Sequence, residues 1–127
     1  MADGFMVFFR RGACDLDAAA RALEGYGLNV TRRGDQLTAR RPGSPEFRVR
    51  LAAEDWVRIE AAEIGTGTPY EAAMRECDVR FEVSFDSLDE ALDEINTLME
   101  VEAALQEASE GYLFLSWNGN LTEPRRE

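Results

Sequence analysis

The sequence contains the same order of patterns twice, and this repetition limits the folds that the chain can adopt. The first copy, over residues 5–30, is a short apolar run, a helical pattern and a Gly-Tyr-Gly turn before a second apolar segment. The second copy, over residues 79–115, is an alternating segment, a helical pattern and a Gly-Tyr pair before a final apolar run. Each copy therefore predicts a β-α-β unit with a right-handed crossover between two strands of one sheet.

Between the two copies, apolar and polar residues alternate. The residues expected to point to one side are Leu37, Ala39, Phe47, Val49, Leu51, Val57, Ile59 and Ala61. Such alternation predicts an antiparallel meander with one solvated face. Glycine, proline and acidic residues mark its turns at 34–35, 42–45 and 54–55. Residues 56–61 also fit a helix, and that alternative stays open.

These patterns predict an α+β fold. Two β-α-β units flanking an antiparallel meander give a ferredoxin-like or related sandwich, with the helices on one face of the sheet. A chain of 127 residues with 45% hydrophobic content is near the usual size of one domain. We expect a single domain over residues 1–121, which ends after a turn at Asn118-Gly119, and a frayed tail over residues 122–127.

The helix that begins after Ser87 has two apolar faces. Ser87 and Glu90 have the spacing of a capping box. A stripe of apolar residues follows at helical spacing: Leu88, Leu92, Ile95 and Met99. A second set points in another direction: Val101, Ala104, Leu105 and Ala108. We therefore expect either a break near residues 100–102 or a second packing surface, and whether one helix continues past Met99 stays open.

The charged residues narrow the possible functions. Every cation is an arginine, no histidine or lysine is present, and the formal net charge is -11. The chain thus lacks the residues with which most enzymes move protons at neutral pH. Residues 1–60 carry a net charge of +1 and residues 61–127 a net charge of -12. The acidic half should repel phosphate and anionic membranes and attract cationic surfaces. We expect a binding protein that is not an enzyme and has neither a nucleic-acid nor a membrane partner.

Neither a metal site nor a cofactor site is indicated. Cys14 and Cys77 are far apart in the sequence and form no CxxC motif. The glycine-rich segment 65–69 lacks the residues of a P-loop or a dinucleotide fingerprint. No apolar run is long enough for a signal peptide or a transmembrane helix. We expect a cytoplasmic protein without a metal or cofactor.

Two segments resemble a group of small bacterial α+β proteins. Residues 81–92 read FEVSFDSLDEAL, and the helix that follows ends in ASEGYLF over residues 108–114. This combination looks like the C-terminal half of proteins that are often encoded beside secreted toxins as immunity proteins. The resemblance covers about the last third of the chain. It implies a stoichiometric, non-enzymatic inhibitor whose acidic surface covers the active site of a cationic toxin.

The leading hypothesis is therefore an acidic, immunity-type module that neutralises a cationic protein partner, such as a bacterial toxin. Acidic residues on and near the second helix, together with one aromatic residue as a possible anchor, form the candidate interface. These residues are Glu82, Asp89, Glu90, Asp93, Glu94, Glu100 and Trp117.

Three alternatives belong to other classes. One is a structural or interaction protein that forms a homodimer through Val101, Leu105 and Ala108. Another is a small-ligand-binding domain with a pocket between sheet and helices, in which carboxylates are the available acid and base groups. The third is a DNA mimic, whose acidic face would occupy the groove of a DNA-binding protein. The sequence assigns no role to the arginines of the meander: Arg40, Arg48, Arg50 and, if residues 56–61 form a strand, Arg58.

Overall fold

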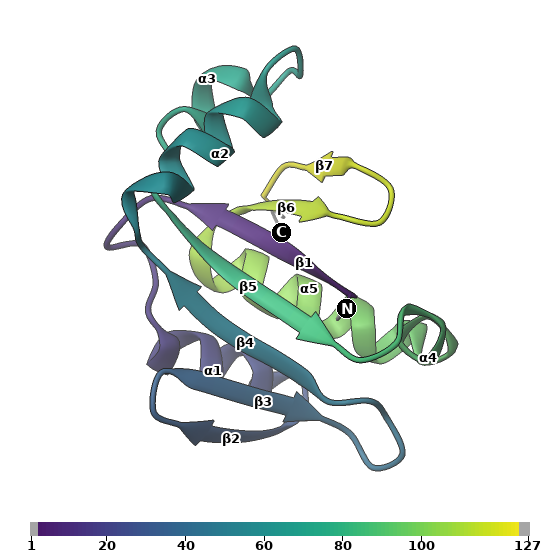
Figure 1. Ribbon diagram of the computed structural model, residues 1–127. Helices are drawn as coiled ribbons and strands as arrows, with labels where there is room; N and C mark the ends of the chain where they lie inside the picture. The colour runs from purple at the N-terminus through teal and green to yellow at the C-terminus, as the bar shows by residue number, and fades with distance from the viewer. Residues whose placement is uncertain (1–2, 125–127) are drawn as a thin grey trace.

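The computed structural model describes residues 3–124 and has an α+β fold, with a seven-stranded sheet and five helices packed against it (Figure 1). The strands are β1 (Asp3–Phe9), β2 (Asn29–Arg33), β3 (Gln36–Arg40), β4 (Phe47–Ala52), β5 (Val79–Phe85), β6 (Tyr112–Leu115) and β7 (Asn120–Thr122). The helices are α1 (Leu16–Gly25), α2 (Asp55–Gly65), α3 (Glu71–Met74), α4 (Leu88–Asp93) and α5 (Ile95–Ser109).

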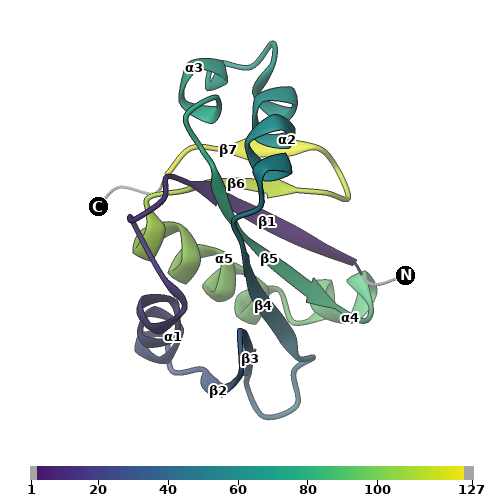
Figure 2. The same ribbon diagram turned by 60° about the vertical axis from the view of Figure 1, so that its left-hand side comes forward.

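All neighbouring strands of the sheet are antiparallel. Their order is β2-β3-β4-β5-β1-β6-β7. The two strands of each predicted β-α-β unit are parallel but not adjacent, because β1 lies between β5 and β6, and three strands lie between β1 and β2. Figure 2 shows the twist of the sheet between β1 and the β2–β3 hairpin.

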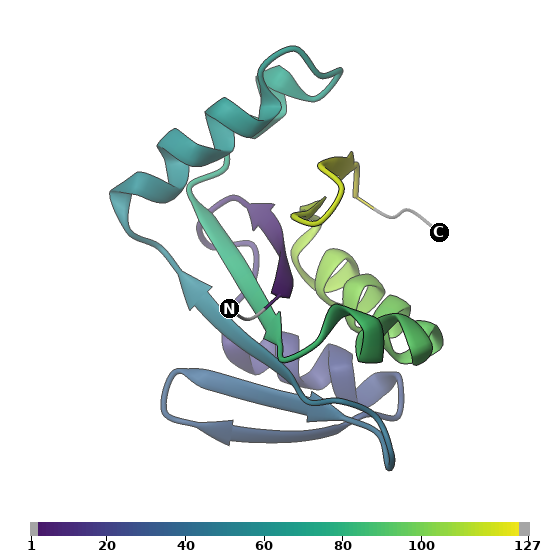
Figure 3. The same cartoon turned by 45° about the vertical axis from the view of Figure 1, so that its right-hand side comes forward.

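Alternate side chains of β1 enter two different cores. Phe5, Val7 and Phe9 belong to the larger core, which α1 and α5 cover. Phe8 points to the other face and belongs to a smaller core, where Val57 of α2 is among its neighbours. Figure 3 shows α2 and α3 standing away from α5, at the end of the sheet where β4 ends and β5 begins.

The expectation that all helices lie on one face of the sheet is therefore wrong. The physical reason is the composition of the central strand β1, which is apolar on both sides. Phe8 and Phe9 are neighbours in β1, point to opposite faces, and are both fully or almost fully buried. A strand of this kind needs a cover on each face, and α2 with α3 supplies the second one.

The meander is confirmed over residues 36–52 but not beyond them. Leu37 and Ala39 of β3 pair with Val49 and Phe47 of β4, and Leu51 continues β4. Residues 57–61 belong to helix α2, so the strand interpretation of that segment is wrong and the helical alternative is correct. Val57 and Ala61 are four residues apart and fully buried, whereas Ile59 is exposed, which is a helical burial pattern.

The segment after β5 forms two helices and breaks earlier than expected. Ser87 caps α4, because its side-chain oxygen accepts a hydrogen bond of 3.3 Å from the backbone N–H of Glu90. The chain leaves helical geometry at Glu94 (φ -107°, ψ 50°), where α4 ends and α5 begins. Helix α5 then runs without interruption through residues 100–102. The segment therefore does contain a helix break, but the break lies at Glu94 and not near residues 100–102.

The predicted C-terminal tail begins too early. The Asn118-Gly119 turn joins β6 to β7, with Gly119 at a φ of 75°. Thr122 still pairs with Leu113, and the carbonyl of Glu123 accepts a hydrogen bond of 3.0 Å from the Gln106 side chain. Residues 125–127 of the predicted tail lie outside the described residues.

None of the helices within residues 3–124 combines the length and the apolar character that crossing a bilayer requires.

Candidate functional site

Helix α4 and its junction with α5 carry four of the six acidic residues that the sequence predicts as an interface. Leu88 and Ala91 attach this helix to the larger core, since Ala91 is fully buried and Leu88 packs against the same cluster. The remaining side of α4 faces solvent. Its exposed carboxylates, with the one at the α4–α5 junction, are Asp89, Glu90, Asp93 and Glu94.

These four carboxylates do not stabilise the described part of the chain, residues 3–124, through ion pairs. Within residues 3–124, none of them forms a salt bridge or a side-chain hydrogen bond with another residue. Asp89 and Glu90 lie in the first turn of α4, where a negative charge interacts favourably with the helix dipole. The corner of the molecule formed by α4 is therefore negatively charged and free to attract cations.

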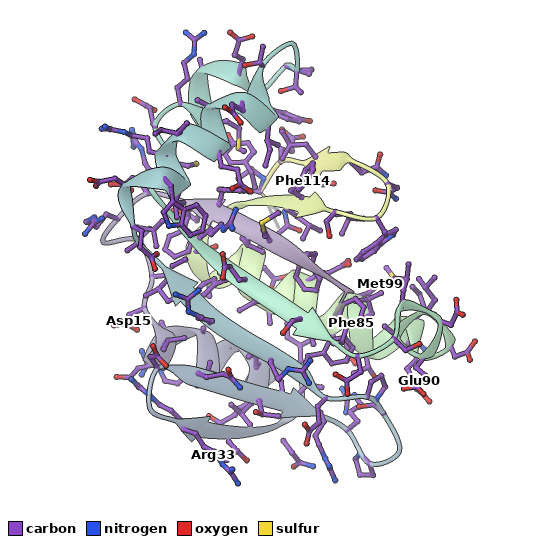
Figure 4. The ribbon with its side chains drawn as sticks, viewed as in Figure 1. Asp15, Arg33, Phe85, Glu90, Met99 and Phe114 are labelled. Carbon is purple, nitrogen blue, oxygen red and sulfur yellow. The ribbon has the colours of Figure 1, made fainter. Side chains whose placement is uncertain are left out.

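Large apolar side chains are exposed beside these carboxylates. Leu92, Ile95 and Met99 are 42%, 43% and 50% exposed. Ile95 and Met99 lie one turn apart on α5 and so share one face, and Leu92 precedes them at the end of α4. Figure 4 shows Glu90 and Met99 at this same end of the molecule. We call Leu92, Ile95 and Met99, together with the four carboxylates, the α4 surface.

The sequence analysis missed the apolar part of the α4 surface. Leu92, Ile95 and Met99 continue the stripe that begins at Leu88, so the sequence pattern does not separate them from that core-facing residue. The break at Glu94 changes the direction of the helix, and α5 buries Leu98, Val101 and Leu105 in place of that stripe. The second apolar set, which includes Val101 and Leu105, was the sequence signal that could have revealed this. A helix that packs on a sheet rarely buries two different faces, so one of the two apolar sets had to be exposed.

Trp117 lies near the α4 surface. Its ring packs edge-on against Phe85, with 6.2 Å between the ring centres. Phe85 is the last residue of β5 and precedes the cap of α4, and Figure 4 shows it beside that helix. Trp117 is half-buried. The structure thus brings Trp117 to the same corner as the four carboxylates of α4.

Glu82 and Glu100 do not belong to that surface. Glu82 lies on the opposite face of the sheet, where it accepts hydrogen bonds from Arg50 at 2.8 Å and from Arg80 Nε at 2.9 Å. Glu100 accepts two hydrogen bonds from Arg41, at 3.0 and 2.8 Å. Both carboxylates are held by arginines of the same chain, so both are structural groups.

The dimer surface proposed as an alternative is also wrong. Val101 and Leu105 are fully buried against the larger core, and Ala108 is half-buried. Val101 and Leu105 face the sheet because α5 uses this side, and not the Leu92–Met99 side, as its core face. These two residues are therefore inaccessible to a second chain in the folded protein.

The arginines of the meander have partners in the chain. Arg40 lies 3.7 Å from Glu46, Arg48 lies 2.9 Å from Asp86, and Arg50 pairs with both Glu54 and Glu82. Arg58 lies on α2 and not on a strand. The positive charges of the meander are therefore largely balanced by nearby acids.

A hollow lies away from the α4 surface, and its lining residues do not form a reactive site. It measures about 760 Å³, and Cys77 and Tyr112 are among its lining residues. Burial raises the pKa of the Cys77 thiol to about 11, so the thiol is un-ionised at neutral pH and a poor nucleophile. Within residues 3–124, no group of three cysteine, aspartate or glutamate side chains is arranged to hold a metal ion.

Comparisons with known proteins found no relative. No protein-family model, no curated protein and no solved structure matches this chain. The geometry of the α4 surface is therefore the basis for the function proposed below.

Proposed function

We propose that this protein is a non-enzymatic inhibitor of the immunity type, which binds a cationic protein partner such as a bacterial toxin through the α4 surface. One observation carries this proposal. Four exposed carboxylates without partners within residues 3–124 lie beside three exposed apolar side chains on one corner of the molecule. Apolar side chains bordered by polar or charged ones are usual in a protein–protein interface.

The charge of the surface favours a cationic partner. Carboxylates that are exposed and unpaired accelerate the approach of a positively charged protein without first breaking an internal ion pair. The resemblance of residues 81–92 to toxin-immunity proteins supports the same class of partner, because that segment ends on α4. A DNA mimic would need the exposed carboxylates but not the exposed apolar side chains, so the α4 surface supports it less well.

Capture of the partner at low salt, followed by kinetics with the purified pair, would test this proposal. The critical variant is Glu90→Arg with Glu94→Arg, which reverses two charges of the α4 surface. The control variant, Asp35→Arg with Glu63→Arg, changes the net charge equally at exposed positions on the β2–β3 turn and on α2. We expect the first pair to slow association at least about tenfold more than the control pair.

Two results would contradict the proposal. Equal slowing by both variants would mean that only the net charge matters and that the α4 surface is not the interface. A complex that does not form at a fixed stoichiometry, or that does not weaken with salt, would exclude a neutralising acidic inhibitor.

We also propose that the architecture is a ferredoxin-like variant. The order of the central strands, β4-β5-β1-β6, supports this assignment. The neighbours of the two innermost strands support it as well, since β5 lies between β4 and β1, and β1 lies between β5 and β6. Helices α1 and α5 also pack against each other on one face of the sheet. In this view the β2–β3 hairpin, the α2–α3 pair and β7 are additions to a common core.

A further inference from the structure

A hollow beside Met99 continues the α4 surface toward α1. It measures about 410 Å³ and is lined by Tyr26, Asn96, Met99, Glu100 and Ala103. Ala103 is almost fully buried, whereas half of the Met99 side chain is exposed. The hollow therefore offers apolar side chains to an incoming group at the edge of the exposed strip.

The charged groups around this hollow are already neutralised. Both oxygens of Glu100 accept hydrogen bonds from Arg41, which also donates to the backbone carbonyl of Tyr26. The Tyr26 hydroxyl in turn donates to Glu107 at 2.7 Å. A cation placed here would have to displace Arg41 from Glu100, so the hollow suits an uncharged side chain better than a charged one.

The unpaired carboxylates lie at the other end of the same strip. Met99 and Ile95 lead from the hollow to Glu94 and Asp93, where α5 meets α4. A purely cationic partner would satisfy those carboxylates but leave the apolar strip in water. A partner with an apolar side chain flanked by cations would cover both, and a few buried anchor residues supply most of the binding energy of protein interfaces.

We infer that the cationic partner inserts one large apolar side chain into the hollow beside Met99, while flanking lysines or arginines meet Asp89, Asp93 and Glu94. This inference rests on the proposed function and adds the chemistry of the contact. In such an interface, the carboxylates chiefly set the association rate, and the apolar anchor chiefly sets the dissociation rate.

Two synthetic peptides serve as probes of this contact. The first contains lysine, leucine and alanine, with the leucines at helical spacing so that one apolar face is flanked by lysines. The second has serine in place of each leucine and the same charge. Each is titrated at low salt into protein labelled at its methyl groups, and the affinity and the NMR shifts of the Met99 and Ile95 methyl groups are recorded.

We expect the leucine peptide to bind more tightly than the serine peptide and to shift the Met99 methyl resonance. Met99→Ala should weaken the leucine peptide about tenfold and leave the serine peptide unchanged, because only apolar contact is removed. The matched control is Ile59→Ala, which truncates an exposed apolar side chain on α2. It should change neither affinity.

Other outcomes separate this inference from the proposed function. Equal, salt-dependent binding of both peptides, unaffected by Met99→Ala, would overturn the apolar anchor and leave the acidic interface standing. Binding of the leucine peptide that shifts other methyl groups but not Met99 would overturn it as well. If neither peptide binds at low salt, both the anchor and the cation-binding surface are wrong.

Discussion

Glu82 on β5 and Glu90 on α4 are close in the sequence but lie in opposite surroundings. Glu82 is held between Arg50 and Arg80, and Arg80 also donates to Glu60 on α2 at 2.7 Å. Glu90 is exposed and forms no ion pair within the described residues. The first carboxylate holds Arg80, which connects helix α2 to the sheet, whereas the second is available to another molecule.

The formal net charge does not distinguish a carboxylate that stabilises the fold, such as Glu82, from one that can bind another molecule, such as Glu90. Both residues contribute equally to the net charge of -11, yet only the unpaired carboxylates project a field that a partner can use. The comparison predicts that substitutions in the Arg80 cluster (Arg50, Glu60, Arg80 and Glu82) change stability, whereas substitutions on the α4 surface change binding.

The largest effect on stability is expected for Arg80→Met. The Arg80 side chain is only 8% exposed, pairs with Glu60 and Glu82, and lies over the ring of Trp56 at 4.6 Å. Its removal would leave Glu60 without its cation and Glu82 with Arg50 alone, so the free energy of unfolding should fall by about 3 kcal/mol. Urea denaturation measures this change. Arg33→Met, at an exposed strand position, is the control and should change stability by less than about 0.5 kcal/mol.

A smaller loss is expected for Arg41→Ala. This arginine joins Glu100 of α5 to the carbonyl groups of the loop after α1, through hydrogen bonds that are partly exposed. Partial exposure weakens each interaction, and we expect a loss of about 1 to 2 kcal/mol in the free energy of unfolding. The same urea assay applies, with Arg21→Ala on the exposed side of α1 as control. If Arg41→Ala lowers the free energy of unfolding no more than the control does, Glu100 is not a structural carboxylate, and the distinction between structural and binding carboxylates is weaker.

Ser87→Ala tests whether the N-cap hydrogen bond of Ser87 determines where α4 begins. Loss of the hydrogen bond from the Glu90 backbone to the Ser87 hydroxyl should cost about 1 kcal/mol, and Ser87→Thr should retain most of the stability. Thermal or urea denaturation of the three proteins is sufficient. If alanine and threonine behave alike, the cap does not determine where α4 begins.

The smallest effect on stability is expected for neutralisation of the α4 surface. Replacement of its four carboxylates by the corresponding amides should change the free energy of unfolding by less than about 0.5 kcal/mol. No ion pair within residues 3–124 is lost, and the lost dipole interaction of Asp89 and Glu90 is offset by relief of the repulsion between like charges one turn apart. The same variant should bind a cationic partner more slowly. Stability comes from urea denaturation and the association rate from stopped-flow fluorescence. A loss of several kcal/mol would show that these carboxylates are structural after all.

The sequence predicted those features that depend on a few neighbouring residues. The cap at Ser87, the turn at Gly34 and the turn at Gly119 are local, because a side chain or a positive φ decides each one. The four acidic residues of α4 were also placed correctly on a solvent-exposed helix, since capping and periodicity agree there.

Features that depend on distant residues were not predicted. The break at Glu94 involves no proline or glycine, so the local sequence gives no reason for it. The alternation over residues 56–61 fits a strand or a helix, and the helix forms because β4 already pairs with β5 and leaves that segment no place in the sheet. The side of α5 that faces the core is likewise set by the sheet beneath it.

The attachment of α4 leaves its outer side free to change. Leu88 and Ala91 hold the helix to the core, and Ser87 and Glu94 define its ends, so none of these roles falls to the outward residues at 89, 90, 92 and 93. Substitutions there can alter which partner is recognised while the fold stays the same. Recognition could therefore diverge rapidly between descendants of one ancestral gene, through attractive and repulsive changes confined to a single turn and a half of helix.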